Sequence, residues 1–268
     1  VCDGIDDDET ILAAINALPG NGGRVILSEG LFLGDEIEIA KDNITLEGQG
    51  HSTVFKLPDG YSTDGIYMLR ITSSDVTISN LCLDGNADAV TGLQTGMIIN
   101  GATRLTIDHV WLQNFTEDGI TGSSLELHLT NSFFYNLGDD GADVNSFSYS
   151  LIEGCTFKDI YENGIDTDGA TYSTITGNTF NNCTTGAAVE LEQELNPGWT
   201  EYCTVSSNTM TDCAIGILVN SGRYNTMVGN TIKDCSVGIL LEDGDDYYST
   251  YNVISSNMIT GGNYGIKE

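Results

Sequence analysis

From about residue 64 onward, apolar and polar positions recur in one fixed order every 22 to 30 residues. Each repeat has an asparagine-like residue ahead of an apolar alternation, and a glycine followed by an apolar residue then opens the next segment. A third short β-rich segment completes each repeat, and none of these segments has a helical period. The recurring polar residues are Asn80, Asp108, Asn131, Cys155, Asn178, Asn208, Asn230 and Asn257. The recurring glycines are Gly96, Gly119, Gly141, Gly164, Gly186, Gly216, Gly238 and Gly265.

Three short strands in the common 22–24-residue repeat predict one coil of a right-handed parallel β-helix. We therefore predict an all-β fold with a single domain over residues 1–268 and regular coils over residues 64–268. The length of the chain allows about 8–10 such coils. We interpret the asparagine column as a structural ladder of amides at a tight turn, where asparagine tolerates a left-handed backbone.

The N-terminal segment follows a different pattern, which predicts a cap. Residues 7–18 place Ile11, Leu12, Ile15 and Leu18 on one face at helical spacing, after Asp6–Asp8 as an N-cap and acidic first turn. Residues 1–30 would therefore form a short capping α-helix and the first strand, which would cover the edge strands. The sequence ends part-way through a coil, so we expect a C-terminal cap that is either minimal or outside this sequence.

Three longer spacings predict loops inserted between coils, at residues 84–95, 191–203 and 243–251. Loops on a rigid scaffold often carry binding residues, and exposed aromatic rings can stack on sugars. Ordinary packing within the loops is the alternative. The aromatic candidates for substrate binding are Trp199, Tyr202, Tyr247 and Tyr248.

The charge of the chain is extreme, with 9 Lys and Arg against 39 Asp and Glu, a net charge of −30. Nucleic acids and anionic membranes need a basic partner surface, so we expect neither. No apolar run approaches the about 20 residues that span a bilayer, so membrane insertion is not expected either. Three explanations of the acidity stay open: solubility or high salt, binding of Ca²⁺ by carboxylates, and repulsion of polyanions.

The seven cysteines show no spacing typical of zinc or redox motifs. Cys183, Cys213 and Cys235 each lie three residues before a repeat glycine. This common position predicts an internal stack of free, buried thiols, with a disulfide between neighbouring rungs as the alternative.

Residues 137–192 concentrate acidic side chains at equivalent positions of three repeats. Acidic or amide residues occupy the second and fourth positions after the glycine in the first two repeats and the fourth position in the third, with one more acidic residue just beyond. Folding alone gives no reason to gather like charges, so this stretch is the predicted functional site. The residues are Asp143 and Asn145, then Asp166 and Asp168, then Glu190 and Glu192. We expect Asn145 to contact substrate, and Asp143, Asp166, Asp168, Glu190 and Glu192 to be able to hold Ca²⁺.

The opening segment DGIDDDETILAAINALPGNGGRVILSEG resembles the N-terminal segment of the pectate-lyase-like β-helix superfamily. With the later repeats, the resemblance covers essentially the whole chain. It implies a right-handed parallel β-helix, and a function only by class. Members include polysaccharide lyases, glycoside hydrolases, uronate epimerases, virion depolymerases and non-catalytic surface proteins.

One part of the acidic stretch is similar to polygalacturonase-like hydrolases, whose pattern is N-T-D-G and then D-D-C/G on the next coil. Here the chain has T-E-D-G ending at Gly119 and G-D-D-G ending at Gly141. The resemblance implies Asp118, Asp139 and Asp140 as catalytic carboxyls, with a separation of about 6.5–9.5 Å if the reaction inverts configuration. The family's G-H-G and R-I-K motifs are absent, which argues against pectin-like substrates.

Another part is similar to the mannuronan epimerase and alginate lyase group, whose pattern is G-F-D-P-H. Gly164-Ile-Asp-Thr-Asp168 matches its aspartate with Asp166 and replaces its histidine with Asp168. The resemblance implies Asp166 and Asp168 as catalytic residues. Abstraction of a proton beside a carboxylate also needs a positive charge, which Ca²⁺ could supply.

We therefore expect a polysaccharide-active protein that works outside the cell, at the cell surface or on a virion. Its activity would be that of a glycoside hydrolase, lyase or epimerase. The alternative is a non-catalytic β-helix module that binds glycans or serves as a structural part. Self-association, end to end or side by side, stays open.

Overall fold

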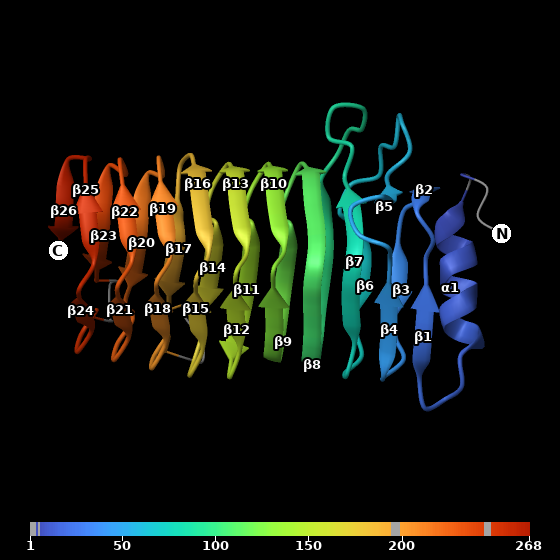
Figure 1. The fold of residues 1–268 in the computed structure, drawn as a ribbon, viewed down its shortest axis with the longest axis horizontal. Coiled ribbons are helices and arrows are strands. Elements are labelled where there is room, and N and C mark those ends of the chain that lie inside the picture. Colours follow the sequence, from blue (N-terminus) through green and yellow to red (C-terminus); the bar gives the residue numbers. More distant parts are fainter. Residues whose placement is uncertain (1–3, 5, 194–198, 244–247) are drawn as a thin grey trace.

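The computed structural model describes residue 4 and residues 6–193, 199–243 and 248–268. Parallel strands stack along one long axis, with helix α1 (Asp7–Ala17) at the N-terminal end and the C-terminus at the opposite end (Figure 1). Each coil contributes a strand to each of three parallel sheets. The predicted all-β, right-handed parallel β-helix with one short N-terminal helix is confirmed.

The first sheet runs through segments of β7 (Thr77–Asp84), β8 (Gln94–Phe115) and β9 (Ile120–Thr130), which are long enough to continue into other sheets. Its other strands are β1 (Gly23–Ile26), β4 (Ile44–Glu47), β12 (Leu151–Glu153), β15 (Thr174–Thr176), β18 (Thr204–Ser206), β21 (Thr226–Val228) and β24 (Val253–Ser255).

The second sheet passes through the ends of β7 and β8. Its other strands are β2 (Gly30–Leu33), β5 (Thr53–Lys56), β10 (Phe133–Leu137), β13 (Thr156–Ile160), β16 (Thr179–Cys183), β19 (Thr209–Thr211), β22 (Thr231–Lys233) and β25 (Met258–Thr260).

The third sheet passes through the beginnings of β8 and β9 and carries the acidic residues. Its other strands are β3 (Ile37–Ile39), β6 (Ile66–Ile71), β11 (Ala142–Ser148), β14 (Ile165–Asp168), β17 (Ala187–Glu192), β20 (Ile215–Asn220), β23 (Val237–Glu242) and β26 (Tyr264–Lys267).

The core lies inside the coils and consists of apolar side chains stacked on like side chains of the next rung. Phe134, Phe157 and Phe180 are fully buried, and their rings stack at centroid distances of 4.5 and 4.9 Å. The six described cysteines are free and buried, as predicted for the thiol stack. A hydrogen bond with Cys183, followed by burial, raises the pKa of Cys213 to about 12, so this thiol is unreactive.

Helix α1 closes the N-terminal end because Ile11 and Ile15 pack into the core. Its N-terminus differs from the prediction: Asp6 is left-handed and its side chain makes no capping hydrogen bond. Asp7 is buried instead, and its carboxylate accepts hydrogen bonds from the backbone N–H groups of Gly4 and Leu33. Lys41 donates to backbone carbonyls at the other end of the helix, including that of Leu18 at 2.9 Å. The cap is therefore held to the first coils by polar contacts at both ends.

The structure confirms the predicted asparagine ladder over its C-terminal rungs. In the N-terminal rungs the prediction assigned the wrong residues to the ladder position. The amides of Asn178, Asn208, Asn230 and Asn257 each accept a hydrogen bond from a backbone N–H of the preceding rung, at 2.8–3.0 Å. In the earlier rung this position belongs to Ser132, and the predicted Asn131 precedes it. The left-handed residue is the one before the ladder, such as Ser207 or Gly229, and the ladder asparagine immediately precedes the strand.

We predict that Asn208→Ala lowers the free energy of unfolding by about 2–4 kcal/mol, since it leaves the buried N–H of Asn178 and carbonyl of Ile175 without their partner. Denaturant unfolding would measure this loss. Thr209→Ala, at the exposed next position, is the matched control and should change stability far less. Equal losses in the two variants would contradict the ladder's role.

Candidate functional site on the third sheet

The third sheet brings the predicted carboxylates together on its outer surface. Asp143 of β11 pairs in register with Asp166 of β14, and Asp166 pairs with Glu190 of β17. Asp168 and Glu192, two residues further along their strands, pair in the same way. Successive rungs lie about 4.8 Å apart, so like charges stand at neighbour distance. We call Asp143, Asp166, Asp168, Glu190 and Glu192 the acidic face.

The third rung reaches this register through a two-residue shift that the glycine pattern did not reveal. Ala188, rather than Gly186, lies next to Gly164, where an added Cβ would meet the Ala188 carbonyl oxygen at 2.6 Å. Glu190 and Glu192 are therefore the second and fourth residues after the true equivalent of the repeat glycine. The shift keeps the acidic residues in line with Asp166 and Asp168.

The same column changes character at the next rung. Glu190 pairs with Leu218 of β20, and Leu218 pairs with Leu240 of β23. These two leucines are largely buried in a small apolar cluster with Ala187, separate from the main core. This column is thus acidic over three rungs and apolar over the following two, whereas the column of Asp168 and Glu192 continues through Asn220 and Glu242.

Asp166 lies at the centre of the acidic face, and its environment is unusual. Its Oδ1 is buried and has no hydrogen-bond partner among the described residues. Burial, followed by the charges of Glu190, Asp140, Asp168 and Asp143, raises the pKa of Asp166 to about 10. Burial and the neighbouring Glu192 and Asp168 also raise the pKa of Glu190 to about 7. At neutral pH a protonated Asp166 therefore stands beside carboxylates that ionise more easily.

Polar neighbours orient the other residues of the face. Thr121 donates to Asp143 Oδ2 at 2.9 Å, and Asn145 lies 3.4 Å from Asp143 Oδ1. Asn220 donates to Glu192 Oε1 at 2.7 Å. Asn145 therefore contributes to the site by holding Asp143, a contact that its predicted role in substrate binding did not include.

The three residues of the hydrolase-like set lie close together, since the charge of Asp139 contributes to the raised pKa values of both Asp118 and Asp140. Asp118 and Asp140 stand on successive rungs just before the repeat glycine, and Asp118 Oδ1 accepts the backbone N–H of Asp140 at 3.1 Å. Asp140 Oδ1 in turn accepts the backbone N–H of Asn163 at 2.6 Å. Burial raises the pKa of Asp118 to about 7 and that of Asp140 to about 8. Both carboxyls thus help to hold the backbone of the turn.

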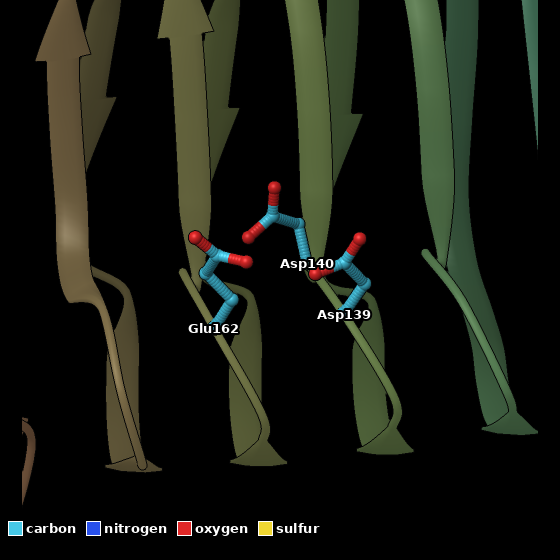
Figure 2. Close-up of side chains that lie close together, drawn as sticks. All are labelled: Asp139, Asp140 and Glu162. Carbon is cyan, nitrogen blue, oxygen red and sulfur yellow. The ribbon is translucent and has the colours of Figure 1, made fainter.

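Asp139 lies with Asp140 and Glu162, where two neighbouring rungs enter the third sheet (Figure 2). One oxygen from each of the three carboxyls lies within 4.8 Å of the others. A hydrogen bond with Asp139, and then burial, raises the pKa of Glu162. Glu162 was absent from the predicted site, although its E-N-G segment follows E-D-G and D-D-G at the same turn of consecutive repeats.

Among the residues that the structure describes, two groups of carboxylates could hold a cation. One is Asp139, Asp140 and Glu162, and the other is Asp166, Asp168 and Glu192, whose ligand atoms also lie within 4.8 Å of one another. Hard cations such as Ca²⁺ take oxygen ligands of this kind. The unpartnered Oδ1 of Asp166 fits such a role, since coordination would satisfy it.

All nine Lys and Arg residues are described, and they lie away from the acidic face. Six form ion pairs elsewhere: Arg24 with Glu47, Arg70 with Glu36, Arg104 with Asp75, Lys158 with Asp159, Arg223 with Glu201 and Lys233 with Asp234. Lys41 binds helix α1, and Lys56 is in β5 of the second sheet. Lys267 follows Leu240 in the outer column, three rungs beyond Glu190.

The predicted aromatic residues are spread over different surroundings. Trp199 lies under the guanidinium of Arg223, with a distance of 4.0 Å to the ring centroid. Tyr248 is exposed, and Tyr247 lies outside the described residues. Tyr202 lies between Tyr172 and Tyr224, with its ring stacked on both. Both faces of Tyr202 are therefore occupied, which corrects the expectation that a sugar stacks on this ring.

Tyr202 belongs to a column of five stacked tyrosines, which we call the tyrosine ladder: Tyr149, Tyr172, Tyr202, Tyr224 and Tyr251. Every member has a left-handed backbone, with φ between 52° and 59°. The left-handed conformation costs about 1–2 kcal/mol per residue, or about 5–10 kcal/mol for five. Four stacked pairs contribute about 2–6 kcal/mol, so stacking offsets only part of this cost.

Sequence comparison places the chain in a family. The model described as "Right handed beta helix region" matches residues 64–205 and 119–267. The chain belongs to the right-handed β-helix family. A comparison with curated protein sequences found no match. No helix in the described part of this β-helix is long and apolar enough to cross a membrane.

Solved structures share the fold at low sequence identity. The A-module of the mannuronan C-5 epimerase AlgE4 from Azotobacter vinelandii superposes with a TM-score of 0.68 at 19% identity, covering 99% of this chain and 95% of that one. An alginate lyase from Paenibacillus gives 0.69 at 18% identity, with coverages of 96% and 97%. An α-1,3-glucanase catalytic unit from Streptomyces thermodiastaticus gives 0.63 at 16%, covering 99% of this chain and 66% of that one. At these identities the likeness establishes the fold.

We predict that the chain loses stability as pH rises from about 5 to about 9. The folded-state pKa values of Asp118, Asp140 and Glu190 are raised to about 7–8, so folding favours their protonated forms. Their contribution is complete below the unfolded pKa of about 4 and is lost as pH passes the folded values. Melting temperatures measured across this range in EDTA would show the decline.

Asp140→Asn should flatten this decline, because the amide keeps the acceptor for Asn163 and cannot ionise. Asn163 itself fills the next position of the same turn, where its Oδ1 accepts the N–H of Ala187. The control is Glu153→Gln, an exposed position on the first sheet, which should leave the slope unchanged. A melting temperature that rises steadily with pH would contradict the burial of these carboxyls.

Proposed function

We propose that the chain binds a polysaccharide across the acidic face and hydrolyses it by acid–base chemistry between carboxyls. The observation that carries this proposal is the position of Asp166, in register between Asp143 and Glu190 with one buried oxygen that no described residue satisfies. A ligand at this face would meet both a proton donor and ionised carboxylates.

The chemistry follows from crowding. Carboxyls on adjacent rungs cannot all ionise, so one keeps its proton and can act as a general acid at neutral pH. Asp166 would donate its proton to the glycosidic oxygen, while Glu190 would attack the anomeric carbon. Water would then displace the sugar from Glu190 and give a proton back to Asp166, which restores both carboxyls. The rung spacing of about 4.8 Å is close to the about 5–5.5 Å between carboxyls of retaining enzymes, and shorter than inversion requires.

The charge of the face favours a neutral glycan. A uronate substrate brings its own carboxylate, and none of the ion-paired Arg and Lys side chains lies where it could neutralise that charge. Net repulsion from a chain of charge −30 adds to this barrier. The structural neighbours named for alginate and mannuronan therefore share the fold, while the residues here favour another substrate class.

The fold also supports a place outside the cell or on a virion. Its structural neighbours include the Dettilon tailspike protein, which superposes with a TM-score of 0.66 at 15% identity, covering 96% of this chain and 60% of that one. A protein that acts on polysaccharides must reach polymers that do not enter cells. We propose this location together with the glycan-directed function.

Asp166→Asn should lower hydrolysis of the responsive glycan by about 10²–10⁴-fold, since an amide cannot donate the proton. A panel of neutral and uronate polysaccharides, assayed for new reducing ends and for unsaturated uronates, would measure it. Asp159→Asn, in β13 of the second sheet, is the matched control and should retain activity. Unsaturated products would indicate elimination instead, and glycan binding without turnover in the unmodified chain would support a non-catalytic module.

A second candidate function is cation-dependent binding of an acidic glycan. The two carboxylate groups and the unpartnered Asp166 Oδ1 favour it. A divalent cation would satisfy that oxygen and could bridge the face to a uronate. In this second candidate Asp166 is a metal ligand rather than a general acid. The hydrolase proposal therefore requires Asp166 to be protonated, whereas cation binding requires it to be ionised.

Calcium should raise the melting temperature relative to EDTA if the second candidate is correct, because a ligand bound only to the native state stabilises it. The rise should shrink in Asp168→Asn and Glu192→Gln. The same substitutions at the other group, Asp139→Asn and Glu162→Gln, distinguish which group binds. A melting temperature unaffected by calcium would remove this candidate and leave the hydrolase proposal standing.

A further inference from the structure

The tyrosine ladder is an exposed feature that the proposed function does not use. It follows the turn between the third and first sheets, and its members are 41–73% exposed. Centroids of neighbouring rings lie 4.9–5.3 Å apart, and the planes deviate from parallel by only 7–11°. The ring faces are buried against one another, so the ladder presents a rigid row of ring edges and hydroxyl groups to solvent.

Tyrosine is an unexpected residue at this position. Earlier rungs place Asn43, Asp75, Arg104 and Glu126 at the same left-handed turn. The other left-handed turns of these coils use Gly, Asn, Asp or Ser, such as Gly177 and Asn182. Five bulky residues in a strained conformation, which their mutual stacking only partly offsets, indicate a role beyond closing the turn.

The surface beside the ladder is almost free of charge, although the chain carries −30. The outward positions of β15, β18, β21 and β24 are Thr174, Thr176, Thr204, Ser206, Thr226, Val228, Val253 and Ser255. Next to the ladder, Arg223 is neutralised by Glu201 through a 2.9 Å contact. The strand before these four in the first sheet, β12, carries an outward charged residue, Glu153.

We propose that the tyrosine ladder and this uncharged part of the first sheet form a side-by-side contact with a second copy of the chain. Two copies of charge −30 repel each other over most of their surfaces, and this strip is where they can approach. Tyrosine suits such a contact, because it supplies apolar area and a hydroxyl at a small entropic cost, here already reduced by stacking.

The period of the ladder argues for a second copy rather than for an unrelated partner. A row of ring edges that repeats once per rung, over five rungs, is matched along its length only by a partner with the same repeat. Another copy of this β-helix has that repeat. A two-fold arrangement would pair the same strip on both chains, as is usual in homodimers.

The area of the strip formed by the tyrosine ladder and the adjoining first-sheet strands determines how tightly the two copies are expected to bind. Four rung steps of about 4.8 Å and a strand of three residues span roughly 20 Å by 10 Å. This is smaller than the about 800 Å² per partner of a stable interface, so the dimer is weak and forms at high protein concentration. Salt should strengthen it, because screening weakens the repulsion between the acidic chains.

Sedimentation equilibrium of the whole chain at increasing protein and NaCl concentrations tests the proposal. We expect a monomer–dimer equilibrium that shifts toward dimer as salt rises. The triple variant Tyr172→Asn, Tyr202→Asn and Tyr224→Asn should raise the dissociation constant by about tenfold or more. Asparagine accepts the left-handed backbone, so the fold should persist, and circular dichroism would verify this. Tyr161→Asn, an exposed tyrosine outside the ladder, should leave the equilibrium unchanged.

A second variant separates the contact from the ladder's own structure. Thr204→Asp places a charge on the adjoining strip without altering any tyrosine, and it should weaken the dimer at low salt. A chain that stays monomeric at every concentration and salt level overturns the proposal. So does a dimer that survives both the triple variant and Thr204→Asp, because the contact would then lie elsewhere.

Discussion

In-register parallel stacking is the constraint on which the rest of this structure depends. Each residue stands about 4.8 Å above its equivalent in the previous coil, so a side chain meets the same kind of side chain above and below it. Inside the coils this yields columns of phenylalanine and buried thiols. At the turns it yields amide and tyrosine ladders, and on the outer surface of the third sheet it forces carboxyls together. A β-helix thus turns any repeated choice of residue into a continuous stripe.

The acidic face shows how this constraint generates chemistry. On most protein surfaces, acidic side chains can rotate away from one another and stay ionised. Equivalent residues on adjacent strands of an in-register parallel sheet are instead held at one fixed spacing. Burial of Asp166 among Asp143, Glu190 and Asp168 makes protonation the less costly state. The same crowding can be relieved by a cation. The function of the face therefore depends on which of the two it holds, a proton or a metal ion.

The fold was predictable from the sequence because the repeat is periodic and the N-terminal helix has a clear apolar face. The acidic columns were predictable for the same reason. The two-residue shift before Ala188 was not, since an alanine can replace the repeat glycine when the neighbouring backbone allows it. Asp118 and Asp140 resemble catalytic residues in the sequence, but their hydrogen bonds to the backbone of the next rung could not be deduced from it. The tyrosine ladder shares the spacing of the asparagines, six residues earlier, but stacked faces cannot be deduced from spacing.

The change from Glu190 to Leu218 along one outer column has a consequence for any extended ligand. Along this one column the surface is carboxylate-rich at one end and aliphatic at the other, while the neighbouring column stays polar through Asn220 and Glu242. A polymer with chemically different ends, laid along this column, would have different free energies in its two orientations. The two ends of this surface are therefore chemically different, and a linear polymer bound along it would prefer the orientation that places one particular end toward the N-terminal cap.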